Sequence, residues 1–173
     1  PLKRIFESRE AVFAGFLVAM LGTGCVTPGG GGTALFNGKN LDGWEVTDFA
    51  GGGAIKVKDG EIHMAMGELI SGINLAHENI PRTNYELEAE AMKLDGNDFF
   101  CGLTFPVGDT FASFIPGGWG GTVVGLSSID GMDAAENETA TFKQFKTHQW
   151  YHFRVRVTPG KIQCWVDDEM VVD

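Results

Sequence analysis

Basic residues are scarce in this sequence of 173 amino acids. Thirteen Lys and Arg stand against twenty-three Asp and Glu, which gives a formal net charge of −10. Proteins bind nucleic-acid phosphates through clustered Lys and Arg, and the sequence contains no basic stripe. We therefore exclude nucleic acid as a partner, whereas a neutral or cationic ligand suits the acidic balance.

The sequence also lacks the motifs of several common enzyme classes. It has no Cys-x-x-Cys, no G-x-S-x-G and no phosphate-cradling glycine motif. These absences argue against a zinc ribbon, a serine hydrolase and a nucleotide-binding protein. Helical periodicity is missing outside the N-terminus, and 25 glycines separate short apolar runs. The pattern predicts one all-β domain, because a chain of this length supplies one good hydrophobic core.

The first residues have the composition of an export signal. Three basic residues precede the apolar run 11–21, which is too short to cross a bilayer but has the length of a signal-peptide core. The run leads into "LGTGC", which resembles a bacterial lipoprotein cleavage box with Cys25 as the lipidated residue. We expect residues 1–24 to be a lipoprotein-type signal peptide and residues 25–33 to be a flexible Gly-rich tether. The predicted location is the periplasm or outer membrane of a bacterium, with membrane contact only through the lipid at Cys25. Plain signal cleavage or an ordinary anchor is the alternative.

Strand signals fill the rest of the chain, residues 34–173. Two turns, Lys58-Asp59-Gly60 and Thr158-Pro159-Gly160, are typical of hairpins between antiparallel strands. Many short strands joined by such turns predict a jelly-roll β-sandwich. We expect strands within residues 34–37, 44–47, 54–64, 85–94, 98–105, 111–115, 122–128 and 150–173.

Two cysteines lie within this predicted domain. Alternation along their strands places both Cys101 and Cys164 on the core side. Because free cysteine is among the most buried residue types, we expect two buried free thiols. A disulfide between them is the alternative in an oxidising compartment.

Four segments carry a resemblance to a known family. They occur in the order seen in the 3-keto-disaccharide hydrolase domain family, and the resemblance covers residues 34–173. It implies a concanavalin A-like jelly roll, usually exported, that acts on sugars already oxidised to a ketone at C3. It also implies further strands after Asp173, so that the domain is incomplete at its C-terminus, and a functional link to a sugar C3-oxidoreductase. The segments are "LFNGKNLDGWEV", "IKVKDGEIHM", "NYELEAEAMKL" and "QWYHFRVRVTPGKIQCWVDDEMVVD".

The residues of the opening motif, "LFNGKNLDGWEV", are expected mainly to shape and pack the chain rather than to bind a ligand. Gly38 and Gly43 permit positive φ in two tight turns, and the aromatic residues around them supply apolar area. We therefore expect Trp44 to be structural, with sugar stacking as the alternative.

Alternation along two strands predicts a polar face. In "YELEAEA" Glu86, Glu88 and Glu90 point away from the core, and in "WYHFRVRV" the same holds for Trp150, His152, Arg154 and Arg156. Gly102 and Gly125, read on the open side of neighbouring strands, would leave room for a ligand. Two interpretations stay open: a solvated ladder of cross-strand ion pairs, or a sugar-binding groove.

Two loops offer further candidates. The loop "SSIDGMDAAENET" is acidic, and Asp130 and Asp133 in it supply hard oxygen ligands that suit Ca²⁺ or Mn²⁺; an ordinary solvated acidic loop is the alternative. In "PGGWGG" Trp119 has four glycines around it. It is either a platform for a sugar ring or a lid that folds back on the core.

Two functional hypotheses follow from these residues and from the resemblance. The first is an enzyme. A ketone at C3 acidifies the C2 proton, so Glu88 or Glu90 can remove it while the C1 substituent leaves and water adds afterwards. Arg154 would hold a sugar oxygen or the developing enolate, and a divalent metal near the acidic loop would polarise the ketone.

The second hypothesis is a non-catalytic carbohydrate-binding module of a surface lipoprotein. In that case Trp119 and Trp150 would stack on glycan rings, with His152, Gly102 and Gly125 lining the same groove. A purely structural envelope domain is a third and weaker alternative. In the first two hypotheses the ligand is a carbohydrate.

Overall fold

A computed structural model describes residues 32–76 and 79–173, and twelve strands and no helix are found within them. These two ranges therefore hold no helix long and apolar enough for a membrane crossing. The predicted signal peptide and Cys25 lie outside the described residues. The strands are β1 (Trp44–Val46), β2 (Ile55–Lys58), β3 (Glu61–Met64), β4 (Ile73–Leu75), β5 (Tyr85–Met92), β6 (Leu103–Val107), β7 (Thr110–Gly118), β8 (Val123–Ser127), β9 (Thr141–Phe142), β10 (Trp150–Thr158), β11 (Lys161–Val166) and β12 (Glu169–Val172).

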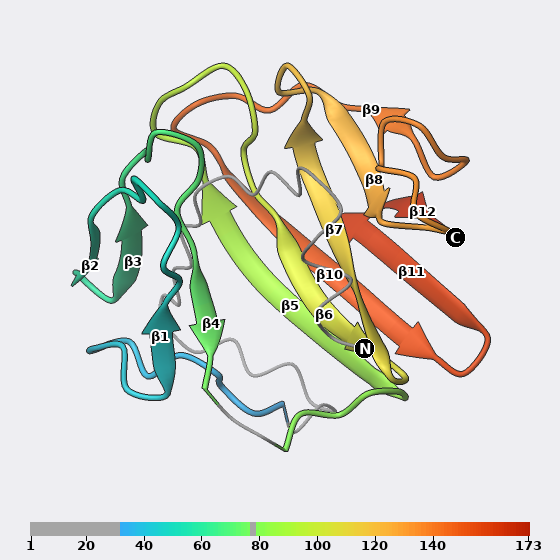
Figure 1. Cartoon of the computed structure of the whole chain (residues 1–173), viewed down its shortest axis with the longest axis horizontal. Coiled ribbons are helices and arrows are strands. Elements are labelled where there is room, and N and C mark those ends of the chain that lie inside the picture. Colours follow the sequence, from blue (N-terminus) through green and yellow to red (C-terminus); the bar gives the residue numbers. More distant parts are fainter. Residues whose placement is uncertain (1–31, 77–78) are drawn as a thin grey trace.

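Two four-stranded antiparallel sheets form the two layers of the domain (Figure 1). One sheet has the order β12-β11-β10-β5, and the other has the order β6-β7-β8-β9. Two smaller sheets, β1-β4 and β2-β3, lie beside the edge strand β5 in Figure 1. The all-β sandwich predicted from the sequence is confirmed.

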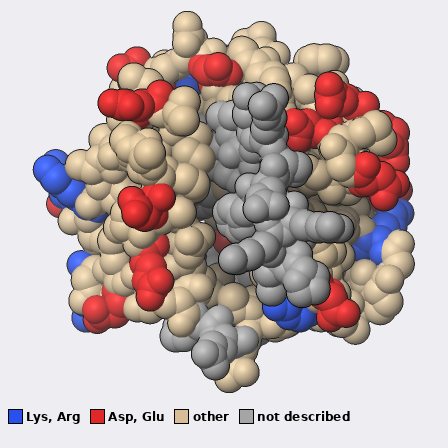
Figure 2. All heavy atoms as spheres, viewed as in Figure 1, with Lys and Arg blue, Asp and Glu red and all other residues tan. Residues whose placement is uncertain are grey.

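The acidic composition is visible at the surface. Figure 2 shows Asp and Glu side chains spread over this view of the molecule with few Lys and Arg among them. A surface of this kind repels polyanions.

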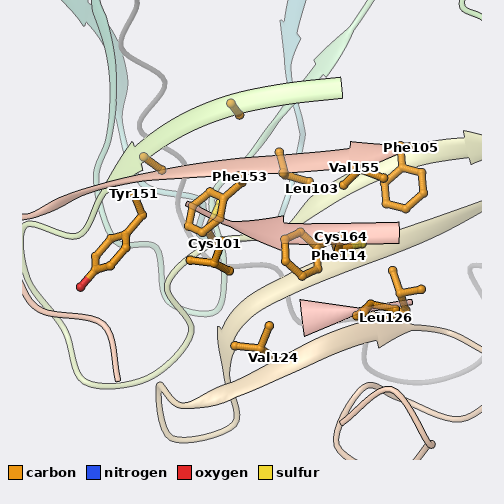
Figure 3. Packing of buried hydrophobic residues seen from close by; sticks show 14 of the residues in the cluster. Cys101, Leu103, Phe105, Phe114, Val124, Leu126, Tyr151, Phe153, Val155 and Cys164 are labelled. Atoms are coloured by element: carbon orange, nitrogen blue, oxygen red, sulfur yellow. The ribbon is translucent and has the colours of Figure 1, made fainter. Parts of the chain in front are cut away.

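The core lies between the two large sheets. Phe153 from β10 meets Phe114 from β7 edge to face, with ring centroids 6.2 Å apart and an interplanar angle of 77°. Figure 3 shows these rings pointing toward each other between the strands. The core-facing residues predicted on β5 and β10 all belong to this cluster or pack against it, which confirms the predicted strand alternation: Tyr85, Leu87, Ala89, Ala91, Tyr151, Phe153, Val155 and Val157.

Cys101 and Cys164 are buried in this core as free thiols. The prediction of two buried thiols is therefore confirmed and the disulfide alternative is wrong. Burial raises the pKa of both thiols far above the ordinary value, because a thiolate would lose its hydration there.

The opening motif is an irregular turn segment rather than a strand, so the strand predicted at residues 34–37 is wrong. The side-chain oxygen of Asn37 accepts hydrogen bonds from the backbone N–H groups of Lys39 and Asn40, at 2.8 and 3.0 Å. These local bonds replace a strand ladder. The indole N–H of Trp44 donates to the carbonyl of Leu35 at 2.9 Å, which ties the segment to β1 and supports the structural interpretation of this tryptophan.

The loop between β8 and β9 covers the outer face of the β6-β7-β8-β9 sheet. Its anchor is Asn137, which is 7% exposed. The amide group of Asn137 donates to the carbonyls of Leu126, Met132 and Asp133 at 2.8, 3.2 and 2.9 Å. Its oxygen accepts the backbone N–H of Thr139 at 2.9 Å. This sheet therefore has no open outer face beneath the loop.

Candidate functional site

The outer face of the β12-β11-β10-β5 sheet carries the polar residues that alternation predicts. The antiparallel register of β5 and β10 sets them opposite one another across the strands. Side chains opposite each other in such a ladder lie close enough to interact. The cross-strand pairs are Glu86 with Arg156, Glu88 with Arg154, Glu90 with His152 and Met92 with Trp150.

Glu88 occupies the middle of this face. Its carboxylate oxygen lies 3.6 Å from Nε2 of His152, and Arg154 stands directly opposite it in the register. The Glu88 side chain is 56% exposed and that of His152 is 40% exposed, so solvent or a ligand can reach both. A carboxylate beside an imidazole and opposite an arginine in the register can take up a proton on the same face as a cation that stabilises negative charge.

Glu86 is engaged differently. Its carboxylate forms an ion pair and hydrogen bond with Nε of Arg156. Glu90 forms no hydrogen bond or ion pair with any residue that the structure describes. Part of the face is therefore the ladder of cross-strand ion pairs that was one of the two interpretations of the sequence. Along β5, Glu88 lies between Glu86, which is ion-paired, and Glu90, which is not.

Trp165 on β11 belongs to this face although it is not among the site residues predicted from the sequence. It pairs with Arg154 in the β10–β11 register and is 9% exposed. The guanidinium carbon of Arg154 lies 4.1 Å from the centre of the Trp165 ring, and that of Arg156 lies 5.3 Å from it. Such stacking fixes the plane of the Arg154 guanidinium and leaves its N–H groups free to donate. Alternation from Cys164 in the core would have found this residue.

Asp167, at the turn after β11, fixes the backbone of His152. The backbone N–H of His152 donates to the Asp167 carboxylate at 2.9 Å, and the backbone N–H of Asp167 donates to the carbonyl of His152 at 2.7 Å. The pair of bonds holds the strand beneath the His152 imidazole in a defined position.

Comparison of the sequence with models of protein families identifies the domain. A model of the 3-keto-alpha-glucoside-1,2-lyase-like domain matches residues 31–173. The chain belongs to this family. Comparisons with curated proteins and with solved structures found no match. The family resemblance inferred from the opening motif and the strand segments is therefore confirmed, together with its all-β fold.

Two glycines predicted to border the site lie in the other layer of the lyase-like domain. Gly102 precedes β6 and Gly125 lies within β8, and neither strand pairs with β5 or β10. Gly125 is covered, because a Cβ built on it would lie 3.0 Å from Oγ1 of Thr139 and 3.2 Å from Cβ of Ala134. This placement corrects the expectation that both glycines leave room for a ligand beside the carboxylates. Gly125 instead lets the β8–β9 loop approach the sheet.

Trp119 also lies outside the carboxylate face, in the turn between β7 and β8. Its φ of 41° is unusual for a residue with a side chain, and the backbone N–H of Gly120 donates to the Asp98 carboxylate at 2.7 Å. The indole ring packs on Phe99, with centroids 4.9 Å apart, and remains 36% exposed. Trp119 thus combines features of both predicted roles, since one part of the ring packs on the protein and another meets solvent.

The residues predicted as metal ligands do not gather into a metal site. Asp130 and Gly131, with φ of 51° and 81°, form a two-residue turn closed by Ile129 and Met132. Asp130 is exposed at the tip of this turn. Across residues 32–76 and 79–173, no three His, Cys, Asp or Glu side chains stand close enough to hold a metal ion. A Ca²⁺ or Mn²⁺ site at Asp130 and Asp133 therefore stays a prediction from the sequence.

Proposed function

We propose that this lyase-like domain cleaves 3-keto-glucosides, with Glu88 as the base that removes the C2 proton. The observation that supports this assignment best is the setting of Glu88, with Arg154 opposite it in the strand register and the His152 imidazole 3.6 Å away. All three side chains project from the same face of the β12-β11-β10-β5 sheet.

The first chemical step uses the acidity that the C3 ketone gives to the C2 proton. The Glu88 carboxylate takes this proton, and the C–H electron pair moves to form an enolate whose charge rests on the C3 oxygen. Arg154 donates hydrogen bonds to that oxygen, and the contact of its guanidinium with the Trp165 ring restrains the cation on the same face. A preoriented cation of this kind stabilises the charge as it develops.

The second step releases the group at C1. The enolate returns to the ketone, its electron pair forms a C1–C2 double bond, and the bond from C1 to the glycosidic oxygen breaks. The leaving oxygen takes a proton from protonated His152, which lies beside the newly protonated Glu88. Water then adds to C1 and gives a proton to His152, and Glu88 returns its proton to C2, which regenerates the imidazolium and the carboxylate. The products are a free 3-keto sugar and an alcohol.

Glu88 suits the role of base better than its neighbours on β5. The Glu86 carboxylate is held by Arg156 and would have to break that ion pair before accepting a proton. Glu90 stands opposite His152 but one ladder step further from Arg154. A substrate must arrive already oxidised at C3, so an enzyme of the sugar C3-oxidoreductase class has to supply it. Lipidation of Cys25 would hold the domain at the bacterial envelope, where exported substrates are found.

The test compares the full chain with two variants on a nitrophenyl 3-keto-glucoside, whose released nitrophenol is followed by absorbance. Glu88→Gln keeps the shape of the side chain but cannot accept the proton, so turnover should fall by about 100-fold or more. Glu86→Gln is the matched control on the same strand and face, and should retain activity within about threefold, since it only loses an exposed ion pair. Nitrophenyl glucoside that is not oxidised at C3 should stay intact.

Full activity in Glu88→Gln would refute the assignment, and Glu90→Gln would then test the remaining carboxylate. A wild-type chain that binds the keto-glucoside without cleaving it would instead support a carbohydrate-binding module. Exposed aromatic rings such as Trp119 are the feature that favours this second function.

A further inference from the structure

We infer a second carbohydrate-binding site, separate from the carboxylate face, in a pocket beside β1 and β2. The pocket has a volume of about 240 Å³. This is smaller than the pockets of roughly 300 Å³ and more that take drug-sized ligands, and it suits a single sugar ring. Residues 46–49, 52, 53, 55, 71 and 72 line it.

The wall of the pocket is built before any ligand arrives. The hydroxyl of Ser71, which is 4% exposed, accepts the backbone N–H of Gly53 and donates to the carbonyl of Ala65, both at 2.7 Å. A Cβ on Gly53 would lie 2.1 Å from that same carbonyl oxygen, so the two chain segments touch backbone to backbone. A fixed wall of this kind lowers the ordering cost of binding.

The open volume depends on a second glycine. A Cβ built on Gly72 would lie 3.1 Å from Cε2 of Phe49 and 3.7 Å from Oγ1 of Thr47. The Phe49 ring, which lines the pocket, therefore lies close to the backbone of Gly72, and a side chain at position 72 would push the ring away. An aromatic ring beside open space is the feature on which the C–H face of a pyranose stacks.

Two polar groups at the pocket have no hydrogen-bond or ion-pair partner among the described residues. Neither the Asp48 carboxylate nor the Thr47 hydroxyl forms a hydrogen bond or ion pair with a residue in the described ranges. A carboxylate accepts hydrogen bonds from sugar hydroxyls, and a hydroxyl can both donate and accept. An aromatic ring with a few fixed polar groups is the usual lining of a small-molecule site. Asp48 and the acidic surface disfavour an anionic ligand, so the ligand class is a neutral pyranose.

This pocket is not part of the proposed catalytic face. It lies at the two small sheets, whose strands pair with one another and not with β10 or β11. Figure 1 places β1 and β2 to the side of the sandwich, beyond the edge strand β5. A sugar held there would keep a glycan chain near the domain without occupying the Glu88 site.

The experiment titrates the full chain with methyl α-D-glucopyranoside and follows backbone amide shifts by NMR. This probe carries no C3 ketone, so the proposed reaction cannot consume it. We expect saturable shifts at Gly52, Gly53 and Gly72 with a dissociation constant around the millimolar range that is usual for one sugar ring. Glu88→Gln should bind the probe like the wild type, so a failure here is distinguishable from a failure of the proposed catalysis.

Variants decide whether the ring and the open volume matter. Phe49→Ala should weaken binding about tenfold or more, since it removes the stacking surface. Gly72→Ala keeps the Phe49 side chain but forces its ring to move away from the added methyl group, so binding should weaken similarly. The control is Phe142→Ala, because Phe142 is 75% exposed on β9 in the other layer and should have no effect. Wild-type affinity in both Phe49→Ala and Gly72→Ala would overturn the inference, as would shifts confined to other parts of the domain.

Discussion

Replacement of Asn137 by alanine should destabilise the domain more than its loop position suggests. The amide of Asn137 donates to three backbone carbonyls and its oxygen accepts from the backbone and hydroxyl of Thr139. Alanine leaves these groups without that partner in a site that is 7% exposed. A buried group left unsatisfied costs about 1–3 kcal/mol, but water entering the loosened loop will satisfy some of them. We therefore expect a loss of about 3 kcal/mol in the free energy of unfolding.

Urea unfolding followed by circular dichroism measures this loss. With a slope of about 2 kcal/mol per molar urea, the midpoint should fall by about 1.5 M. Asn74→Ala is the matched control, because Asn74 is exposed on β4 and its side chain forms no hydrogen bond with the described residues. It should change stability by less than about 0.5 kcal/mol. A loss below about 1 kcal/mol in Asn137→Ala would show that the loop is not anchored as described.

Three other predictions concern the anchor, the thiols and alkaline pH. In a bacterium that lipidates proteins, the full chain should enter the detergent phase of a phase-separation extraction and Cys25→Ser should not; equal partitioning would refute the anchor. Cys101 and Cys164 should resist thiol reagents in the native protein and react in urea, since both are fully buried; fast native labelling would contradict the core. Burial raises the pKa of Tyr85 to about 12 from an ordinary value of 10.0, so the contribution of this phenol to stability is present below pH 10 and is lost as pH rises toward 12. The urea midpoint should therefore fall less between pH 9 and pH 11 in Tyr85→Phe than in the wild type; an equal fall in both would contradict this.

Much of the sandwich could be predicted from the sequence because two of its long strands, β5 and β10, alternate between core-facing and outward-facing residues. In β10 every second residue from Tyr151 to Val157 is buried, and this period is visible in the letters alone. The hairpin turn at Asp59 and Gly60 is equally local, since both residues have positive φ. The prediction of a strand at residues 34–37 was wrong because the apolar residues there resemble a strand, whereas hydrogen bonds to the Asn37 side chain bend the backbone into turns. The three-residue β4 and the two-residue β9 are too short to give a period.

The candidate site was predictable only in part, because sequence alternation gives the face of a strand but not its partner strands. Glu88 and Arg154 come together because β5 and β10 are neighbours in one sheet. Gly125 has the same alternation signal but lies in the other sheet under Thr139. Which strands pair is decided by long-range packing, and a single sequence carries little information about it. The pocket at Phe49 was not predictable for the same reason, since it is assembled from loops before β2 and before β4.

The two outer faces of the sandwich differ in how freely their residues can be exchanged. On the sheet beneath the β8–β9 loop, the Asn137 amide bonds the loop to β8, and the loop packs directly on Gly125. A larger side chain at Gly125 would therefore displace the backbone of the loop. On the β12-β11-β10-β5 sheet, the side chains of β5 and β10 that point outward touch solvent and one another, while the core residues between them stay unchanged. Substitutions on that face can therefore be made position by position, and the opposite layer serves as its fixed support.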